Sequence, residues 1–596
     1  MGSEAAARKV ALDAVQSLGR GFDVTADFRT KFCKKRLVHI VNDGLESLTL
    51  PGDITIDAPS VIKCDKGECT RHTSDLMQFQ QMSQAFNKRA LIDGKIPLGH
   101  FNAMYDFTGS WFEDAMQTKN LAFDGKFITL FQLQLTSSLL LRKEVKNAVP
   151  SAWEPAALAR FISLYGTHIV VRVSVGGQDV LYLKENASSM MSSADVHKLL
   201  KEFGDQMFAK KGGQKMQDGN HLSRRSIAPD ETMYVDGTKS LFKNKDVTIF
   251  TKMRGGLLSA KTPTQWQATV TSTPDVIMMS FVPITSLLSG TPGSGFLNHA
   301  INLYLRYKPP IEDIRCFLEF QVPRQWAPVY SDLPLGPPQR AITLPSLQFC
   351  LMGPRLYVNT AQISVGRKPV TGLRLYLEGR QNNRLAIHLQ HLASLPRVLE
   401  PYWNPEIHEQ SNWHGSDNVE SSEWFEHVQC RTFSHVCTAR VKYNPVWTRS
   451  KSGVFVVTGA QLEVKSYGLK NVLHLRLQFS RIPGCTILKS RWYQPCSSNL
   501  SEKSRFFSTL STAFTSHMVK KPVQPSPVVV DSGVFLGEPP IPIQQPKLLR
   551  FVDTRELTKG PQDMPGHWLV IGAQLDVDGG KISLNAKYSL LNFDFK

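Results

Sequence analysis

The stretch LARFISLYGTHIVVRVSVGGQDVLYL, residues 158–183, changes its pattern halfway along. Residues 158–165 place apolar side chains at i, i+3, i+4 and i+7, which predicts one buried face of a helix. Residues 169–175 alternate instead, which predicts a strand with one buried face. The pair Gly176-Gly177 then removes two side chains, as a bulge, a sharp bend or a close backbone approach requires. The stretch therefore predicts a helix, a tight corner, a strand and a kink.

The chain is long and basic. Its 596 residues exceed what one hydrophobic core accommodates, so two or more domains are expected. A net charge of +18 favours an acidic partner, such as an anionic membrane, and plain solvated surface is the alternative. Residues after 338 hold 30 basic and 18 acidic residues, against 39 and 33 before, so most of the excess lies in the second part. No run of five basic residues marks a nucleic-acid tail, and no nucleic acid is expected as a partner.

The N-terminal sequence predicts the compartment. It lacks the unbroken apolar core of a signal peptide, and no stretch of eighteen apolar residues predicts a spanning helix. Nine cysteines, an odd number, indicate reduced thiols. We expect a cytoplasmic protein that can also lie at the periphery of the plasma membrane.

Two proline-rich stretches divide the chain. Residues 321–345 are typical of a linker, and residues 521–547 are typical of a long surface loop. The predicted organisation is a first domain at 1–335, a linker at 336–345 and a second domain at 346–596.

The second domain contains an internal repeat. Ala361, Ala460 and Ala573 each begin an Ala-Gln-[Ile/Leu]-x-Val motif followed by a turn and an alternating strand, which predicts a hairpin. The wide spacing indicates three large β modules rather than a solenoid of short units. We expect an all-β domain with pseudo-threefold symmetry, prism-like or trefoil-like. The three copies span 359–377, 458–477 and 571–590.

The first domain mixes strands and helices. Residues 99–110 and 126–135 are predicted as strands, with a short polar segment between them. A helix start follows at Ser192, and polar sequence continues to about Asp246. A further strand is interrupted by small residues at Gly255 and Gly256. The apolar face of the helix comprises Val196, Leu199, Leu200, Phe203 and Met207.

Tyr165, Gly166, Thr167 and His168, followed at a fixed spacing by Gly176 and Gly177, resemble the signature of the membrane attack complex/perforin superfamily. The stretches FNAMYDFTGSW, LAFDG and GRGFDVTADFR resemble its plant branch. That branch includes proteins named for constitutively activated cell death and necrotic spotted lesions, which restrain salicylic-acid-dependent defence and programmed cell death. The resemblance covers roughly residues 15–335.

The resemblance implies an α+β first domain, with a bent antiparallel four-stranded sheet flanked by two helical clusters. It also implies self-association into rings on membrane lipid, with both clusters refolding into strands of a β-barrel pore. The inserts are expected at 109–125 and 184–246. Trp111 and Phe112 in the first, and Val196, Leu199, Leu200 and Phe203 in the second, are the membrane-insertion candidates. The alternative is a non-perforating scaffold or a regulator that binds lipid or glycan.

The resemblance makes Gly176, Gly177, Gly255 and Gly256 candidates for a hinge, with ordinary bulges as the alternative. We expect valine at the first pair to be costly because of a positive φ. His168 is expected to be a packed, hydrogen-bonded residue rather than a catalytic or metal-binding one.

No metal, cofactor or enzymatic activity is expected. Phosphate-loop, His-Glu-x-x-His and Gly-x-Ser-x-Gly motifs are absent from the sequence. Two groups of candidate ligands lack a fourth member and the spacing of a zinc site. They are Cys64, Cys69 and His72, and Cys430, His435 and Cys437.

Overall fold

The described chain forms two compact units, unit 1 (Met1–Arg315) and unit 2 (Cys316–Lys596). The predicted boundary at 335/336, the linker 336–345 and nearly all of the loop 521–547 lie outside the described residues. Residues 316–327 belong with unit 2, because Cys316 and Phe320 lie in its core and residues 324–327 pair within one of its sheets. The computed structural model describes residues 2–40, 45–50, 54–136, 139–208, 237–260, 262–328, 354–379, 382–403, 412–418, 422–444, 446, 453–494, 547–560, 563 and 565–593.

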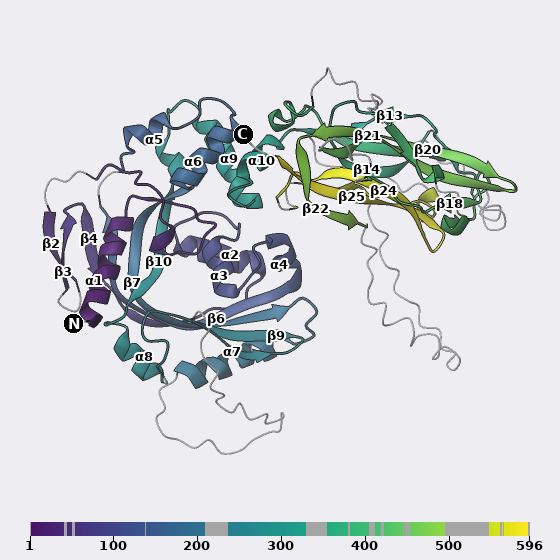
Figure 1. Cartoon of the computed structure of the whole chain (residues 1–596). Helices are drawn as coiled ribbons and strands as arrows, with labels where there is room; N and C mark the ends of the chain where they lie inside the picture. Colours follow the sequence, from purple (N-terminus) through teal and green to yellow (C-terminus); the bar gives the residue numbers. More distant parts are fainter. Residues whose placement is uncertain are drawn as a thin grey trace, which may run out of the picture. The chain divides into compact units, whose positions relative to one another are not determined.

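One antiparallel sheet organises unit 1, with β7 (His168–Asn186) at its centre. β6 (Thr118–Leu135) pairs with one edge of β7 over most of its length. On the other edge, β10 (Asp275–Pro283) pairs with the first half of β7 and β9 (Val247–Arg254) with the second half. Figure 1 shows these strands curving along their length. The strands predicted at 126–135 and 169–175 are confirmed as parts of β6 and β7.

The outer strand beyond β6 is interrupted as well. β4 (Ile62–Lys66) and β5 (Cys69–Thr73) follow each other along β6. The expected four strands therefore correspond to two continuous strands flanked by two interrupted ones. β8 (Thr238–Lys243) and β1 (Gly21–Phe22) extend the sheet to eight strands, and β2 (Leu45–Leu50) forms a separate hairpin with β3 (Ile54–Pro59).

Helices cover both faces of the sheet along the second half of β7 (Figure 1). Because side chains alternate along a strand, Val180 and Tyr182 of β7 pack with α2 and α3, whereas Leu181 and Leu183 pack with α7 on the opposite face. The helices are α1 (Gly2–Ser17), α2 (Phe79–Arg89), α3 (Gly99–Tyr105), α4 (Trp111–Gln117), α5 (Lys143–Asn147), α6 (Pro155–Tyr165), α7 (Ser193–Phe208), α8 (Pro263–Thr269), α9 (Ser294–Tyr307) and α10 (Ile314–Glu319), which crosses the division between the units.

Two predictions between residues 99 and 125 are wrong. Residues 99–110 do not form a strand, because α3 occupies Gly99–Tyr105 and buries Phe101 and Met104 on one face. The aromatic composition suggested a strand, but packing against β7 selects the helical spacing of the buried residues. Residues 111–125 are not one polar insert either, since α4 ends at Gln117 and β6 begins at Thr118.

The described part of unit 2 contains three sheets, each centred on a long antiparallel hairpin. Apolar residues from all three hairpins share one core, including Leu375, Leu475 and Leu575. The hairpins are β14 (Val370–Glu378) with β15 (Arg384–Leu392), β20 (Gly453–Tyr467) with β21 (Lys470–Pro483), and β24 (Leu569–Asp578) with β25 (Lys581–Phe593).

The three hairpins have matching neighbours. A two-residue strand pairs with the first strand of each hairpin at Gly372, Gly459 or Gly572, and an outer strand pairs antiparallel with the second. The inner strands are β23 (Leu557–Thr558), β13 (Ile363–Ser364) and β19 (Val441–Lys442), and the outer ones are β11 (Arg324–Ala327), β16 (Asn412–Gly415) and β22 (Cys485–Tyr493). The remaining strands are β12 (Tyr357–Val358), β17 (Phe425–His427) and β18 (His435–Cys437).

The first copy of the sequence repeat lies at a different position in the structure than predicted. The hairpins predicted at 458–477 and 571–590 are confirmed, but residues 359–377 are not a hairpin, because β13 pairs with β20 and β14 lies in another sheet. The counterpart is Val370-Thr371-Gly372-Leu373, because all three hairpins shift register just before the glycine. Leucine and arginine replace the Ala-Gln of the motif here, so the motif search selected the wrong segment.

Candidate functional site at the bend of the central sheet

A line of small residues crosses the central sheet where its outer strands are interrupted. Gly67 separates β4 from β5, Gly176 and Gly177 lie in the middle of β7, and Gly255 follows β9 directly. β6 shifts register just after Thr129, opposite Gly176. Three of these glycines were predicted from the sequence, and Gly67 was not. The N–H of Gly67 donates to the carbonyl oxygen of Leu130 in β6 at 3.1 Å.

The close packing around β7 leaves no room for a side chain at Gly176 or Gly177. A Cβ atom on Gly176 would lie 1.9 Å from the carbonyl oxygen of Ile128, and one on Gly177 would lie 2.7 Å from the Val270 side chain. Neither glycine has a positive φ, so the predicted reason for the cost of valine is wrong and steric exclusion replaces it. Gly255 does have a positive φ, of 66°, and its Cβ would lie 2.3 Å from the carbonyl oxygen of Gly176.

A tryptophan of α8 packs directly against the bend. Trp266 is 1 % exposed, and its indole Nε1 donates to the carbonyl oxygen of Gly255 at 2.8 Å. A Cβ on Gly256 would lie 2.5 Å from the same nitrogen. The short helix α8 is therefore in close contact with Gly255 and Gly256, directly after β9.

The Tyr-Gly-Thr-His tetrad forms the corner between α6 and β7. Tyr165 ends the helix, and Gly166 has a φ of 76° with its Cβ position 2.5 Å from the carbonyl oxygen of Phe22. The N–H of Thr167 donates to the same oxygen at 2.9 Å. His168 is buried, its Nδ1 lies 3.0 Å from the Thr167 hydroxyl, and burial lowers its pKa to about 4. The imidazole is therefore neutral at pH 7 in a packed corner.

A buried ion pair ties the end of β9 to the N-terminal segment. Arg254, directly before Gly255, donates to the Asp27 carboxylate and to the carbonyl oxygen of Phe28. His100 Nδ1 lies 3.1 Å from Asp27. Burial alone would raise the pKa of Asp27, but His100 and the charge of Arg254 hold it well below its usual range. No charge pattern in the sequence pairs these residues, although Asp27 lies in the GRGFDVTADFR stretch.

A second carboxyl at the bend, that of Asp179, lacks a hydrogen-bond partner among the residues that the structure describes. Asp179 of β7 is 3 % exposed, and among the described residues its Oδ1 has no hydrogen-bond partner. Its cross-strand neighbours are Lys126 and Met253. The Lys126 ammonium donates to Gln267 of α8 at 2.6 Å. Burial raises the pKa of Asp179 to about 7.

Asp179 is expected to make unit 1 less stable as the pH rises. Between about pH 4 and pH 7 the native carboxyl holds a proton that the unfolded chain has released, so the free energy of unfolding falls, and it levels off above pH 7. Asp179→Asn should remove this slope and stabilise the protein at pH 8 by up to about 4 kcal/mol. Urea unfolding from pH 4 to 8 measures the change. Asp57→Asn, at an exposed position of β3, is the control, and an unchanged slope in Asp179→Asn would contradict the assignment.

An ionic clamp holds α7 on the sheet. Arg71 of β5 donates to the buried Asp124 of β6 at 2.6 and 3.1 Å, and to Asp205 of α7 at 3.0 Å. Gly204 lets the helix approach, since its Cβ would lie 2.1 Å from the Asp124 carboxylate. These residues were not predicted from the sequence, because they are far apart in the chain and form no motif.

The insertion candidates lie on helices that pack against the sheet. In α4, Trp111 is half-buried and donates to the carbonyl oxygen of Arg306 at 3.1 Å, whereas the side chain of Phe112 is outside the described residues. In α7, Val196 and Leu200 are buried, and Leu199 and Phe203 are half-buried. The bend and its glycines lie in the middle of β7, whereas these helices pack against its second half.

The first helical segment is longer than predicted. It runs between β5 and β6, over residues 74–117, and includes α2, α3 and α4. Residues 118–125 of the predicted insert 109–125 belong to β6 instead. In the predicted second insert, 184–246, residues 184–186 belong to β7 and residues 238–243 form β8 of the same sheet. Within the described residues, no helix combines the length and the apolar character needed to cross a bilayer.

Comparison with known proteins identifies the fold. A family model described as the MAC/Perforin domain matches residues 6–313. The chain belongs to the membrane attack complex/perforin (MACPF) family. Three MACPF domain-containing proteins of Arabidopsis thaliana are similar over both units: At4g24290 is 48% identical over 98% of this chain and 96% of its own length. NSL1 is 44% identical over 98% and 97%, and CAD1 is 42% identical over 98% and 96%.

Solved structures resemble the MACPF chain more distantly. The crystal structure of GNIP1Aa from Chromobacterium piscinae matches with a TM-score of 0.35 and 14% identity. The match covers 50% of this chain and 56% of that one.

Proposed function

We propose that this MACPF protein restrains salicylic-acid-dependent defence and programmed cell death, and that it can assemble on anionic membranes and insert as a β-barrel pore. The likeness to NSL1 and CAD1 over nearly the full chain supports the plant assignment. The observation that carries the pore is the placement of two helical segments. Each joins neighbouring strands of one bent sheet, and their described helices, α2 and α3 in the first and α7 in the second, lie on its opposite faces.

Both segments are long enough for insertion. A bilayer tolerates only helices and closed barrels, so each segment must become paired strands of roughly 9–11 residues. Residues 74–117, and residues 187–246 between β7 and β9, each exceed the roughly 20 residues that two such strands require. The predicted insert 109–125 is shorter than two such strands, and the start of the first segment at residue 74 supplies the missing length.

Anionic lipid is the partner that the charge favours. The residues after 338 carry most of the positive excess. Basic groups near an anionic leaflet contribute about 1 kcal/mol each. In this proposal unit 2, with pseudo-threefold symmetry, attaches first and unit 1 then associates with other copies into a ring.

The alternative is a regulator that keeps the fold without perforating. The clamp favours it, because release of α7 must break the contacts of Arg71 with Asp124 and Asp205. Asp124 is 1 % exposed, and a buried carboxylate without its partner is costly. Such a protein would act as a scaffold or bind lipid or glycan.

A reversible lock distinguishes the two functions. A Cβ on Gly204 would lie 3.0 Å from the Asp124 carboxyl carbon, so Gly204→Cys and Asp124→Cys are close enough to form a disulfide. The oxidised double variant should release no dye from anionic liposomes, and reduction should restore release. The two single variants are the controls. Leakage with the disulfide intact would exclude insertion of α7, and absence of leakage in wild type would favour the non-perforating regulator.

A further inference from the structure

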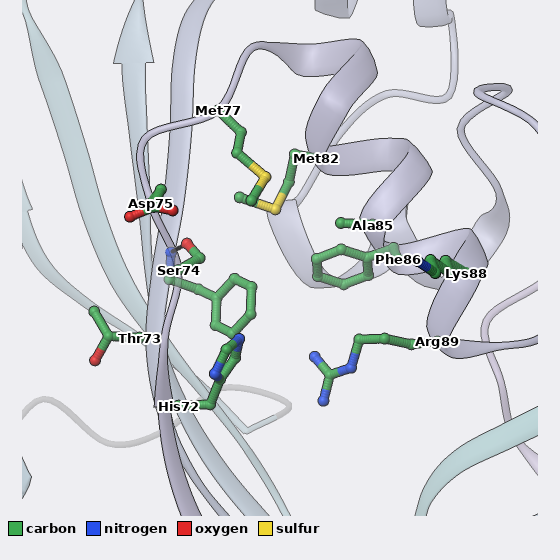
Figure 2. A pocket seen from close by; sticks show the side chains of 11 residues that line it. His72, Thr73, Ser74, Asp75, Met77, Met82, Ala85, Phe86, Lys88 and Arg89 are labelled. Carbon is green, nitrogen blue, oxygen red and sulfur yellow. Dashed lines mark hydrogen bonds between the residues drawn. The ribbon is translucent and has the colours of Figure 1, made fainter.

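A cavity of about 410 Å³ lies between α2 and the strands β5 and β6 (Figure 2). Most of its wall is apolar. The helix α2 and the two strands all contribute to it, so the cavity lies where the first helical segment meets the sheet. The apolar side chains that line it are Met77, Met82, Ala85, Phe86 and Phe123.

The Arg89 guanidinium faces this space and has no anionic partner within the described part of the chain. Figure 2 shows the Arg89 guanidinium pointing into the cavity from the end of α2, opposite His72. It lies 5.9 Å from the centre of the Phe123 ring and 5.0 Å from that of Phe127. Among the described residues no carboxylate lies within 4.0 Å of it and no hydrogen bond joins it to the protein.

The surroundings of Arg89 explain why a ligand would be stabilised there. The guanidinium lies against the rings of Phe123 and Phe127, and this partial burial lowers its pKa. Arg89 is exposed to solvent overall, and it also lines the cavity. Because aromatic rings flank the guanidinium and no carboxylate of the described residues pairs with it, its N–H groups remain available for charge-assisted hydrogen bonds to an anionic ligand.

The other polar groups of the wall do not provide that partner. Lys88 adds a second positive charge beside Arg89. Asp75 lines the cavity, but Figure 2 shows its carboxylate turned away from the space between strand and helix. The Ser74 hydroxyl already accepts the N–H of Phe123 at 2.9 Å. The cavity therefore combines an apolar body with a positive end.

We propose that this cavity binds a small amphipathic carboxylate, with its carboxylate on Arg89 and its apolar body against Met77, Met82 and Phe86. The planar guanidinium fork matches a carboxylate through two parallel hydrogen bonds. The volume lies within the range of small-molecule sites, which hold a mostly apolar ligand with few polar contacts. The site does not depend on pore formation and goes beyond the proposed function.

Octanoate and benzoate are the probes, with octanol and benzamide as neutral counterparts. Titration of the full chain, by calorimetry and by thermal shift, should show tighter binding of the carboxylates by about tenfold or more. Arg89→Gln should lose that preference and Arg89→Lys should keep part of it. Ala85→Phe, which fills the cavity, should lose binding of both kinds.

The matched control is Arg160→Gln, an exposed arginine of α6 with the same change of charge, which should bind like wild type. Equal affinity for the neutral counterparts, or full carboxylate binding by folded Arg89→Gln, would overturn the proposal. So would the absence of carboxylate binding by wild type at millimolar concentration.

Discussion

Gly176→Val is expected to destabilise unit 1 by about 3 kcal/mol or more and to leave little soluble protein. The Cβ position lies 1.9 Å from the carbonyl oxygen of Ile128, and that oxygen belongs to the backbone of the adjacent strand. It cannot swing away as the end of a side chain can, so β6 and β7 must separate at the bend. Soluble yield and the melting temperature measure the loss.

Alanine substitutions test the steric reason. Gly176→Ala introduces the same Cβ and should cost almost as much as valine. Gly177→Ala should cost less, because its Cβ meets the Val270 side chain, which can shift. Gly295→Ala, with no atom within 4 Å of its Cβ, should be neutral or slightly stabilising. Wild-type stability of Gly176→Ala would contradict the role of close approach at the bend.

Asp27→Asn is expected to cost about 3–5 kcal/mol, because it leaves the Arg254 guanidinium buried without its anion. Arg254 is 4 % exposed, so water cannot replace the lost carboxylate. The same change should loosen the junction of β9 with Gly255, which hydrogen exchange of the β9 amides would report. Urea unfolding at pH 7 measures the loss of stability.

The loss of stability in Asp27→Asn should shrink only in acid. The pKa of Asp27 is lowered in the native state, so its stabilisation is complete above the ordinary carboxyl pKa and is lost only in acid, below about pH 4. The difference between wild type and Asp27→Asn should therefore be constant from pH 5 to 8.

Two further variants test the interpretation of the Asp27→Asn result. Arg254→Met added to Asp27→Asn should recover part of the loss, because it removes the unpaired charge. Asp65→Asn breaks an exposed pair with Lys63 and should cost no more than about 1 kcal/mol. A loss for Asp27→Asn as small as for Asp65→Asn would show that the buried pair does not hold the bend.

The sequence by itself determined the elements whose pattern is local. The helix, corner and strand at 158–175 follow from periodicity and from Gly166, and α7 follows from the spacing of Val196 and Leu200. The family followed from the tetrad and the glycine pair. Two of the three hairpins of unit 2 were predictable, because alternation and a glycine turn are encoded within about twenty residues.

Only the tertiary structure decided the rest, because the deciding contacts join residues far apart in the chain. Gly67 acquires its role only when β6 lies beside it, and Asp27 and Arg254 become a pair only when the N-terminal segment meets the end of β9. Residues 99–105 are helical because burial against β7 outweighs a strand-like composition. Local periodicity fixes a segment's buried face, but the partner across that face, and hence the clamp, the bend and the cavity, arises from packing.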